Sequence, residues 1–169
     1  MRRIVVLGCA GTGKTTFTQA LAVRIAAPAV ILDHVWRPEW GADDGEHFRA
    51  LVREAHAGDT WVSDGNFALA TFDLRLPRAD LVVWLERPRW LCLWRASTRV
   101  FRAGEQHRLA DLAKVGAFIW NFDRINRPRI EAALRQTGPD VPVVRLRTDK
   151  ETAAFLLKAR ALEKAVRPV

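Results

Sequence analysis

Residues 8–15 have the sequence Gly-Cys-Ala-Gly-Thr-Gly-Lys-Thr, which matches the phosphate-loop pattern G-x-x-x-x-G-K-[ST]. Glycines at these spacings let several backbone N–H groups point at one phosphate, and the helix that follows adds its positive dipole end. We therefore predict a nucleoside triphosphate site in which Lys14 contacts the β- and γ-phosphates and the Thr15 hydroxyl contacts Mg²⁺. The residues expected to bind the nucleotide are Gly8, Gly11, Thr12, Gly13, Lys14, Thr15 and Thr16.

Two aspartates follow predicted strands and could supply the remaining chemistry. Asp33 comes directly after an apolar run at 29–32, and Asp64 comes directly after a strand predicted at 60–63. A carboxylate in either place can hold Mg²⁺ or accept the proton of an acceptor hydroxyl. We expect Asp64 at the metal with Thr15, but the sequence does not decide which aspartate is the base. Asn66 is expected to contact the acceptor, although residues 64–66 also suit a simple Asx turn.

The net charge of +8 is unevenly distributed along the chain. Residues 1–84 hold nine basic and ten acidic side chains, whereas residues 85–169 hold eighteen basic and nine acidic ones. Nine of the ten basic residues at 87–129 are arginines, whose planar guanidinium groups suit bidentate contacts with phosphate oxygens. This segment could clamp a triphosphate or follow a nucleic-acid backbone, and composition does not separate the two.

The apolar periodicity predicts strands that alternate with helices. A hydrophobic fraction of 49% in 169 residues suits one folded domain, 1–169, and no apolar run approaches the ~20 residues that cross a bilayer. We therefore expect a cytoplasmic α/β protein whose parallel sheet is covered on both faces. Pro128 should break the fourth helix, while Thr148 and Glu151 have the capping-box spacing that opens the last one. Strands are predicted at 4–7, 29–32, 60–63, 80–85 and 141–146, and helices at 14–27, 46–57, 90–102, 118–134 and from 148 to about 162.

Further motifs occur in an order that resembles a known family. They are Asp64-Gly65-Asn66-Phe67, Leu74-Arg75-Leu76, Ala79-Asp80, Pro-Arg-Trp-Leu-Cys-Leu-Trp-Arg at 88–95, Ile119-Trp120-Asn121 and Arg127-Pro128-Arg129-Ile130. Together they resemble, over nearly the whole chain, the adenylate-kinase-like proteins called DNA topology modulation proteins. The resemblance implies a three-layer P-loop NTPase fold with a five-stranded parallel sheet. It also implies an acceptor-binding excursion at 34–60 and a short Arg-rich lid at about 96–128.

The same resemblance gives roles to individual arginines. Arg95 and Arg99 lie one helical turn apart and would stack on adenine and touch the phosphates. Arg108 and Arg124 are candidates to contact the transferring phosphoryl group, and Arg127 is a candidate to bind the acceptor. Each of these arginines could instead lie on a solvated helix face.

A small kinase suits this chain better than other phosphate-loop proteins, because five strands fit one domain and no Asn-Lys-x-Asp motif marks a GTP switch. We predict a kinase that uses ATP and Mg²⁺ and transfers the γ-phosphoryl group to an unidentified small-molecule or nucleotide acceptor. Trp36 could form a wall for that acceptor or fold its loop onto its own core. Two alternatives stay open: an ATP-binding protein in which 87–129 grips nucleic acid, and a regulator with residual ATP hydrolysis and no acceptor.

Overall fold

One parallel sheet organises the chain in the computed structural model, which describes residues 2–35, 45–65, 68–102 and 108–166. Five strands lie in the order β2-β3-β1-β4-β5, and every neighbouring pair is parallel. The α/β architecture with a five-stranded parallel sheet is therefore confirmed. The strands are β1 (Arg3–Gly8), β2 (Ala29–Ile31), β3 (Trp61–Asp64), β4 (Leu81–Leu85) and β5 (Val143–Leu146).

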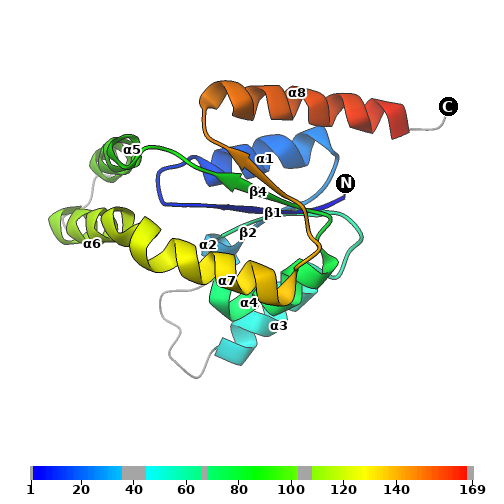
Figure 1. Cartoon of the computed structure of the whole chain (residues 1–169), viewed down its shortest axis with the longest axis horizontal. Coiled ribbons are helices and arrows are strands. Elements are labelled where there is room, and N and C mark those ends of the chain that lie inside the picture. Colours follow the sequence, from blue (N-terminus) through cyan, green and yellow to red (C-terminus); the bar gives the residue numbers. More distant parts are fainter. Residues whose placement is uncertain (1, 36–44, 66–67, 103–107, 167–169) are drawn as a thin grey trace.

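Helices cover both faces of the sheet, so the fold has three layers (Figure 1). On one face lie α1 (Lys14–Arg24) and α8 (Asp149–Val166); on the other lie α3 (Gly45–Ala55), α4 (Ala68–Arg75) and α7 (Arg127–Thr137). Two shorter helices, α2 (Leu32–Val35) and the 3₁₀ helix η2 (Leu76–Arg78), connect elements. None of the described helices is long and apolar enough to cross a membrane.

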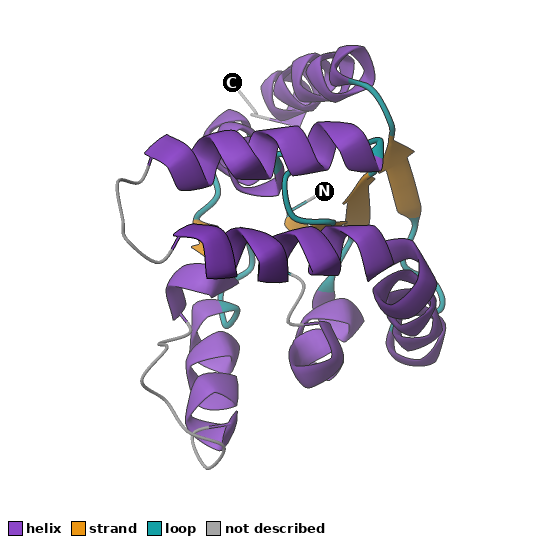
Figure 2. Cartoon of the chain, turned by 90° about the vertical axis from the view of Figure 1, so that its left-hand side faces the viewer, coloured by secondary structure: helices purple, strands orange, loops and turns teal. Residues whose placement is uncertain are grey.

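A pair of antiparallel helices crosses the edge of the sheet where the strands end. These helices are α5 (Arg89–Arg102) and α6 (Arg108–Asn121), and they run side by side across the front of Figure 2. A π-helical segment, η3 (Phe122–Asn126), joins α6 to α7. We call α5 and α6 together the hairpin. It occupies most of the segment that was expected to form a lid.

Alternating side chains of the central strands build two hydrophobic clusters. Ile4 and Val6 of β1 face α1 and α8, whereas Val5 and Leu7 face α3, α4 and α7. Because both faces are covered, β1 and β4 are apolar at successive positions rather than at every second one. Two tryptophans, Trp61 of β3 and Trp84 of β4, are buried in the cluster that faces α3, α4 and α7.

The structure corrects three predicted elements. The helix expected from 118 begins at Arg108, because the Ala-rich stretch before 118 is itself helix-forming. The break expected at Pro128 is a π-helical segment just before it, which lets the chain pass a residue without an N–H donor. The strand predicted at 29–32 ends at Ile31, and Asp33 therefore lies in α2. The sequence analysis did not predict α4, which has only eight residues.

The capping box at the start of α8 is confirmed. The Glu151 backbone N–H donates to the Thr148 hydroxyl at 3.1 Å, and the Thr148 N–H donates to the Glu151 carboxylate at 3.2 Å. These bonds satisfy two N–H groups that a helix start leaves without partners. They also fix Asp149 at the first turn of α8, beside the end of β4.

Buried His56 should make the stability of this fold depend on pH. Its Nδ1 lies 2.6 Å from the Val52 carbonyl oxygen and its ring packs edge-on against Trp61. Burial lowers the pKa of His56 to about 4, whereas an unfolded chain has a value near 6.5. As pH falls from 6.5 toward 4 the unfolded state takes up a proton that the folded state resists. His56 therefore lowers the free energy of unfolding by about 2–3 kcal/mol in that window.

The substitution His56→Gln isolates this effect, because glutamine supplies an amide N–H donor in place of the ring N–H and does not titrate. Urea denaturation at pH 7 and pH 4.5 should show a smaller loss of stability in the variant than in the wild type. Equal losses in the two proteins would contradict the assignment to His56.

Candidate active site

The phosphate loop lies between the end of β4 and the first turns of α5. Gly11 has φ +79° and a Cβ there would lie 2.4 Å from the carbonyl oxygen of Cys92, so only glycine lets the loop touch α5. Thr12 donates its hydroxyl to the Cys9 carbonyl at 2.8 Å. Lys14 donates its ammonium to the same carbonyl at 3.0 Å. The lysine is therefore folded over the loop, where a bound phosphate would meet it.

A hydrogen bond joins the loop to the neighbouring strand. The Thr15 hydroxyl donates to one carboxylate oxygen of Asp64 at 2.7 Å, because β1 and β3 are adjacent and Val6 pairs with Asp64 in register. Asp64 is only 1% exposed, and burial raises its pKa, against the opposing effects of Lys14 and the Thr15 hydroxyl. Its other oxygen, Oδ1, is buried and has no hydrogen-bond partner among the described residues.

Thr15 and Asp64 are the residues that would hold Mg²⁺. An oxygen pair of this kind fits a cation that takes one or two protein ligands and completes its shell with phosphates and water. The described residues contain no group of three or more His, Cys, Asp and Glu side chains that could bind a metal without such help. Thr15 and Asp64 fit Mg²⁺ because Oδ1 of Asp64, which has no hydrogen-bond partner among the described residues, could bind the ion.

The charge of Lys14 depends on burial and on three other charged groups. Burial lowers the pKa of Lys14, while the carboxylates of Asp64 and Asp33 favour its charged form and Arg99 disfavours it. Asp33, Asp64 and Arg99 thus all act electrostatically on the lysine of the phosphate loop. Asp33 is exposed, in contrast to the buried Asp64.

A cavity of about 370 Å³ extends from the loop along α1. Gly13 and Thr16 of the phosphate loop and first helical turn line it, and so do Arg95, Asp149 and Thr152. A concave site that combines a helix N-terminus with polar side chains suits a nucleotide. Arg95 thus lines a cavity that adjoins the phosphate loop, and its role toward a nucleotide stays a prediction.

Asp149 connects two arginines at the far end of this cavity. Arg95 donates to one of its oxygens at 3.0 Å and Arg87 to the other at 3.1 Å. Arg87 also donates to the Thr152 hydroxyl at 2.7 Å and is almost completely buried. The sequence did not predict these ion pairs of Asp149 with Arg87 and Arg95, because only the fold places the end of β4 next to the start of α8.

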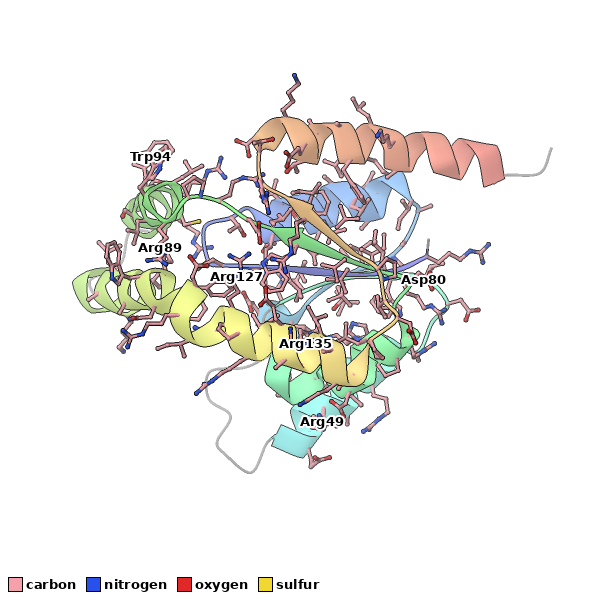
Figure 3. The ribbon with its side chains drawn as sticks, in the orientation of Figure 1. Arg49, Asp80, Arg89, Trp94, Arg127 and Arg135 are labelled. Atoms are coloured by element: carbon pink, nitrogen blue, oxygen red, sulfur yellow. The ribbon has the colours of Figure 1, made fainter. Side chains whose placement is uncertain are left out.

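Arg127 lies on the other side of β1 from the two aspartates. It forms an ion pair with Glu86 and lies over the ring of Trp84, which places it beside β4 and β5 (Figure 3). A cavity of about 290 Å³ opens there between Arg127, Glu86 and Cys9 of the phosphate loop. The structure does not bring Arg127 next to Asp33 and Asp64, and its role toward an acceptor stays a prediction.

Glu86 is the centre of a cluster of arginines. Arg145 donates to one of its oxygens at 2.7 Å and Arg147 to the other at 3.0 Å, in addition to the pair with Arg127. Burial raises the pKa of Glu86, but these hydrogen bonds outweigh it and hold the pKa below its ordinary value. Arg127 and Arg145 both lie over Trp84. Part of the arginine excess therefore joins β4, β5 and α7 rather than contacting a substrate.

For the remaining predicted site residues the structure shows no contact with the phosphate loop among the described side chains. Arg124 lies exposed in η3. Arg108 is the first residue of α6, and its side chain is outside the described part of the structure. Trp36 and Asn66 also lie outside the described residues. Their roles stay predictions.

Substitutions of two loop glycines should have different costs. Gly13 has φ +89° with no heavy atom within 4 Å of a built Cβ, so Gly13→Ala should cost only backbone strain of about 1–2 kcal/mol. Gly11→Ala adds the clash with the α5 backbone, which should cost about 1–3 kcal/mol more. Urea denaturation of the two variants measures this difference. Equal losses would show that the loop does not touch α5 in solution.

No protein-family model and no curated protein matches the chain. Solved structures of similar fold include an unliganded sugar kinase from Janibacter sp. HTCC2649, with 19% identity, a TM-score of 0.59, and coverage of 100% of this chain and 99% of that one. A gluconokinase from Sinorhizobium meliloti 1021 has 19% identity and a TM-score of 0.57 over 98% of this chain and 93% of that one. A shikimate kinase from Acinetobacter baumannii in complex with shikimate has 18% identity and a TM-score of 0.56 over 98% and 90%.

The chain has the fold of small P-loop kinases. This confirms the predicted fold class. The narrower resemblance to the DNA topology modulation proteins stays a prediction based on the sequence motifs.

Proposed function

We propose that this protein is a phosphotransferase that uses ATP and Mg²⁺ and transfers the γ-phosphoryl group to a small-molecule acceptor. The observation that carries the proposal is the hydrogen bond between Thr15 of the phosphate loop and buried Asp64. The other carboxylate oxygen of Asp64 is buried and has no hydrogen-bond partner within the part of the chain that the structure describes. The fold shared with a sugar kinase and a gluconokinase supports the same reaction class.

The different environments of the two aspartates suggest their roles. Asp64 is buried and bonded to Thr15, which suits a metal ligand, whereas exposed Asp33 can meet an incoming hydroxyl. In the proposed reaction the acceptor oxygen bonds to the γ-phosphorus, the bond from that phosphorus to the bridging oxygen of ADP breaks, and Asp33 takes the hydroxyl proton. Mg²⁺ held by Thr15 and Asp64 would neutralise phosphate charge, and Lys14 and Arg99, which act on each other electrostatically, are proposed to add positive charge there.

The acceptor would lie on the side of the loop where Asp33 is found. Residues 34–60, with Trp36, and the turn at 64–66, with Asn66, are the proposed acceptor-binding segments. Arg95 and Arg99 are proposed to contact the nucleotide, and Arg108 and Arg124 the phosphoryl group in transfer. The names of the similar kinases make sugars, sugar acids and hydroxylated ring acids the first acceptors to test, before nucleosides and nucleoside monophosphates.

Substitutions of Lys14 and Asp33 should separate binding from transfer. Lys14→Met should weaken ATP affinity, measured by calorimetry with Mg²⁺, because it removes the ammonium beside the phosphates. Asp33→Asn should leave ATP affinity within a few-fold, yet lower acceptor-dependent ADP release by about 10²–10⁴-fold, the usual contribution of a general base. The assay couples ADP release to a panel of hydroxyl acceptors.

Two results would contradict this proposal. If the wild-type protein binds no ATP, the proposed nucleotide site is wrong. ADP release that no acceptor increases, and that Lys14→Met abolishes, would instead favour an ATP-hydrolysing regulator without an acceptor.

A second candidate function rests on exposed tryptophans of the hairpin. Trp90, Trp94 and Trp120 are 70%, 63% and 62% exposed, which is unusual for such large apolar side chains. Trp94 points away from the body of the molecule in Figure 3, and Arg89 lies over the ring of Trp120. Further exposed basic residues on the hairpin and η3 are Arg99, Lys114 and Arg124. Exposed aromatic rings beside basic side chains are typical of surfaces that bind single-stranded nucleic acid.

This second candidate predicts salt-dependent binding of oligonucleotides. The affinity for oligo-dT should fall linearly on a logarithmic plot against salt, with a slope of about −0.7 for each phosphate contacted. Trp94→Ser should weaken binding by about 1–3 kcal/mol, and Leu157→Ser, an exposed apolar residue on α8, should not. Fluorescence anisotropy measures both quantities. No binding even at low salt would eliminate the candidate.

A further inference from the structure

Arg75 is a charged side chain with 0% exposure, at the end of α4 beneath the end of β3. Its guanidinium group donates to the Ser63 hydroxyl at 3.3 Å and to the Gly65 carbonyl at 3.3 Å. These two residues flank Asp64 in the chain. One planar side chain thus contacts the side chain of the residue before, and the backbone of the residue after, the carboxylate proposed to bind Mg²⁺.

The guanidinium group of Arg75 also interacts electrostatically with Asp64. Burial lowers the pKa of Arg75 to about 10, and Asp64 favours its charged form, so the guanidinium group stays protonated at neutral pH. The reverse effect is present too, because Arg75 helps to keep Asp64 ionised against its own burial. Burying an arginine costs desolvation free energy, and an apolar side chain would fill this space without that cost. Packing alone therefore does not explain why the side chain is charged.

The turn that Arg75 holds is tightly packed against the other side of the site. Gly65 has φ +135°, and a Cβ there would lie 2.7 Å from the Cβ of Leu32, the residue before Asp33. A shift of the turn would move Asp64 relative to both Thr15 and Asp33. The position of Gly65 is therefore linked to both carboxylates.

We propose that Arg75 is a positioning residue of the phosphotransfer site. Its two hydrogen bonds fix the end of β3 so that Asp64 keeps one oxygen on Thr15 and directs the other to the side where Mg²⁺ would be held. This inference rests on the proposed function, because it assigns Arg75 to the same site. Residues that orient a metal ligand in this way contribute to metal affinity without touching the metal.

Arg78 offers a matched control only three residues away. It donates to the carbonyl oxygens of Ala57 at 3.0 Å and Gly58 at 3.2 Å, and also to that of His56. These carbonyls belong to the loop that precedes β3. Arg75 and Arg78 thus anchor opposite ends of one strand, and only the Arg75 end adjoins the phosphate loop.

The test compares ATP affinity with Mg²⁺ and with EDTA, by calorimetry, in wild type, Arg75→Met, Arg75→Lys and Arg78→Met. The ratio of the two affinities measures the contribution of Mg²⁺. Arg75→Met should lower this ratio by about 10–100-fold, the usual cost of removing a residue that orients a metal ligand. Arg75→Lys should lower it less, because lysine keeps the charge but lacks the planar fork. Arg78→Met should keep the wild-type ratio, even if its melting temperature falls.

The outcomes are distinct. An equal loss of affinity with and without Mg²⁺ in Arg75→Met would show a merely structural role and overturn the inference, as would a wild-type ratio in either Arg75 variant. The same drop in Arg78→Met would overturn it as well. If Arg75→Met does not fold, Arg75→Lys decides by itself. If the wild-type protein does not bind ATP in the first titration, the proposed function itself is contradicted. If the wild type binds ATP but the Arg75 variants behave as described above, only the inference about Arg75 is contradicted.

Discussion

The hydrogen bond from Thr15 to Asp64 joins the first turn of α1 to the end of β3, and much of the molecule serves to hold its two ends. One end is fixed by the phosphate loop, which packs against α5 at a glycine. The other is fixed by parallel pairing of β1 with β3 and by buried Arg75. A buried carboxylate needs compensating charge, and Lys14 and Arg75 both favour the ionised form of Asp64. The requirement to stabilise one buried negative charge thus explains why basic side chains lie inside this part of the protein.

The arginines of the second half of the chain have several uses. Arg87 and Arg95 meet at Asp149 beside the cavity along α1, and Arg127 joins Arg145 and Arg147 around Glu86. Arg99 acts electrostatically on Lys14, while Arg89 contacts Asp123 and the ring of Trp120. The arginines therefore form internal ion pairs, line a cavity beside the phosphate loop and supply exposed charge. Composition alone suggested only phosphate binding, of a triphosphate or of nucleic acid.

The fold and the phosphate loop were largely predictable because their signals are local. A buried strand reads as a β-branched run, a helix start as a capping box, and the loop as a fixed spacing of glycines, lysine and threonine. The elements that were missed or misplaced lack such signals. The helix α4 has only eight residues, the start of α6 follows residues without apolar periodicity, and η3 depends on how α6 and α7 must meet around Pro128. Packing decides these elements.

By itself the sequence determined the phosphate loop, the parallel α/β class, an aspartate at the end of one strand and another shortly after a second strand, since each depends on neighbours in the chain. Only the tertiary structure decided that these two aspartates differ in burial. Asp64 is buried against Thr15, and Asp33 is exposed in a short helix, because β3 is adjacent to β1 and β2 lies at the edge of the sheet. It also decided that Arg75 lies beneath Asp64 and that Arg127 lies elsewhere. Burial and charge pairing arise between residues far apart in sequence, and spacing along the chain does not encode them.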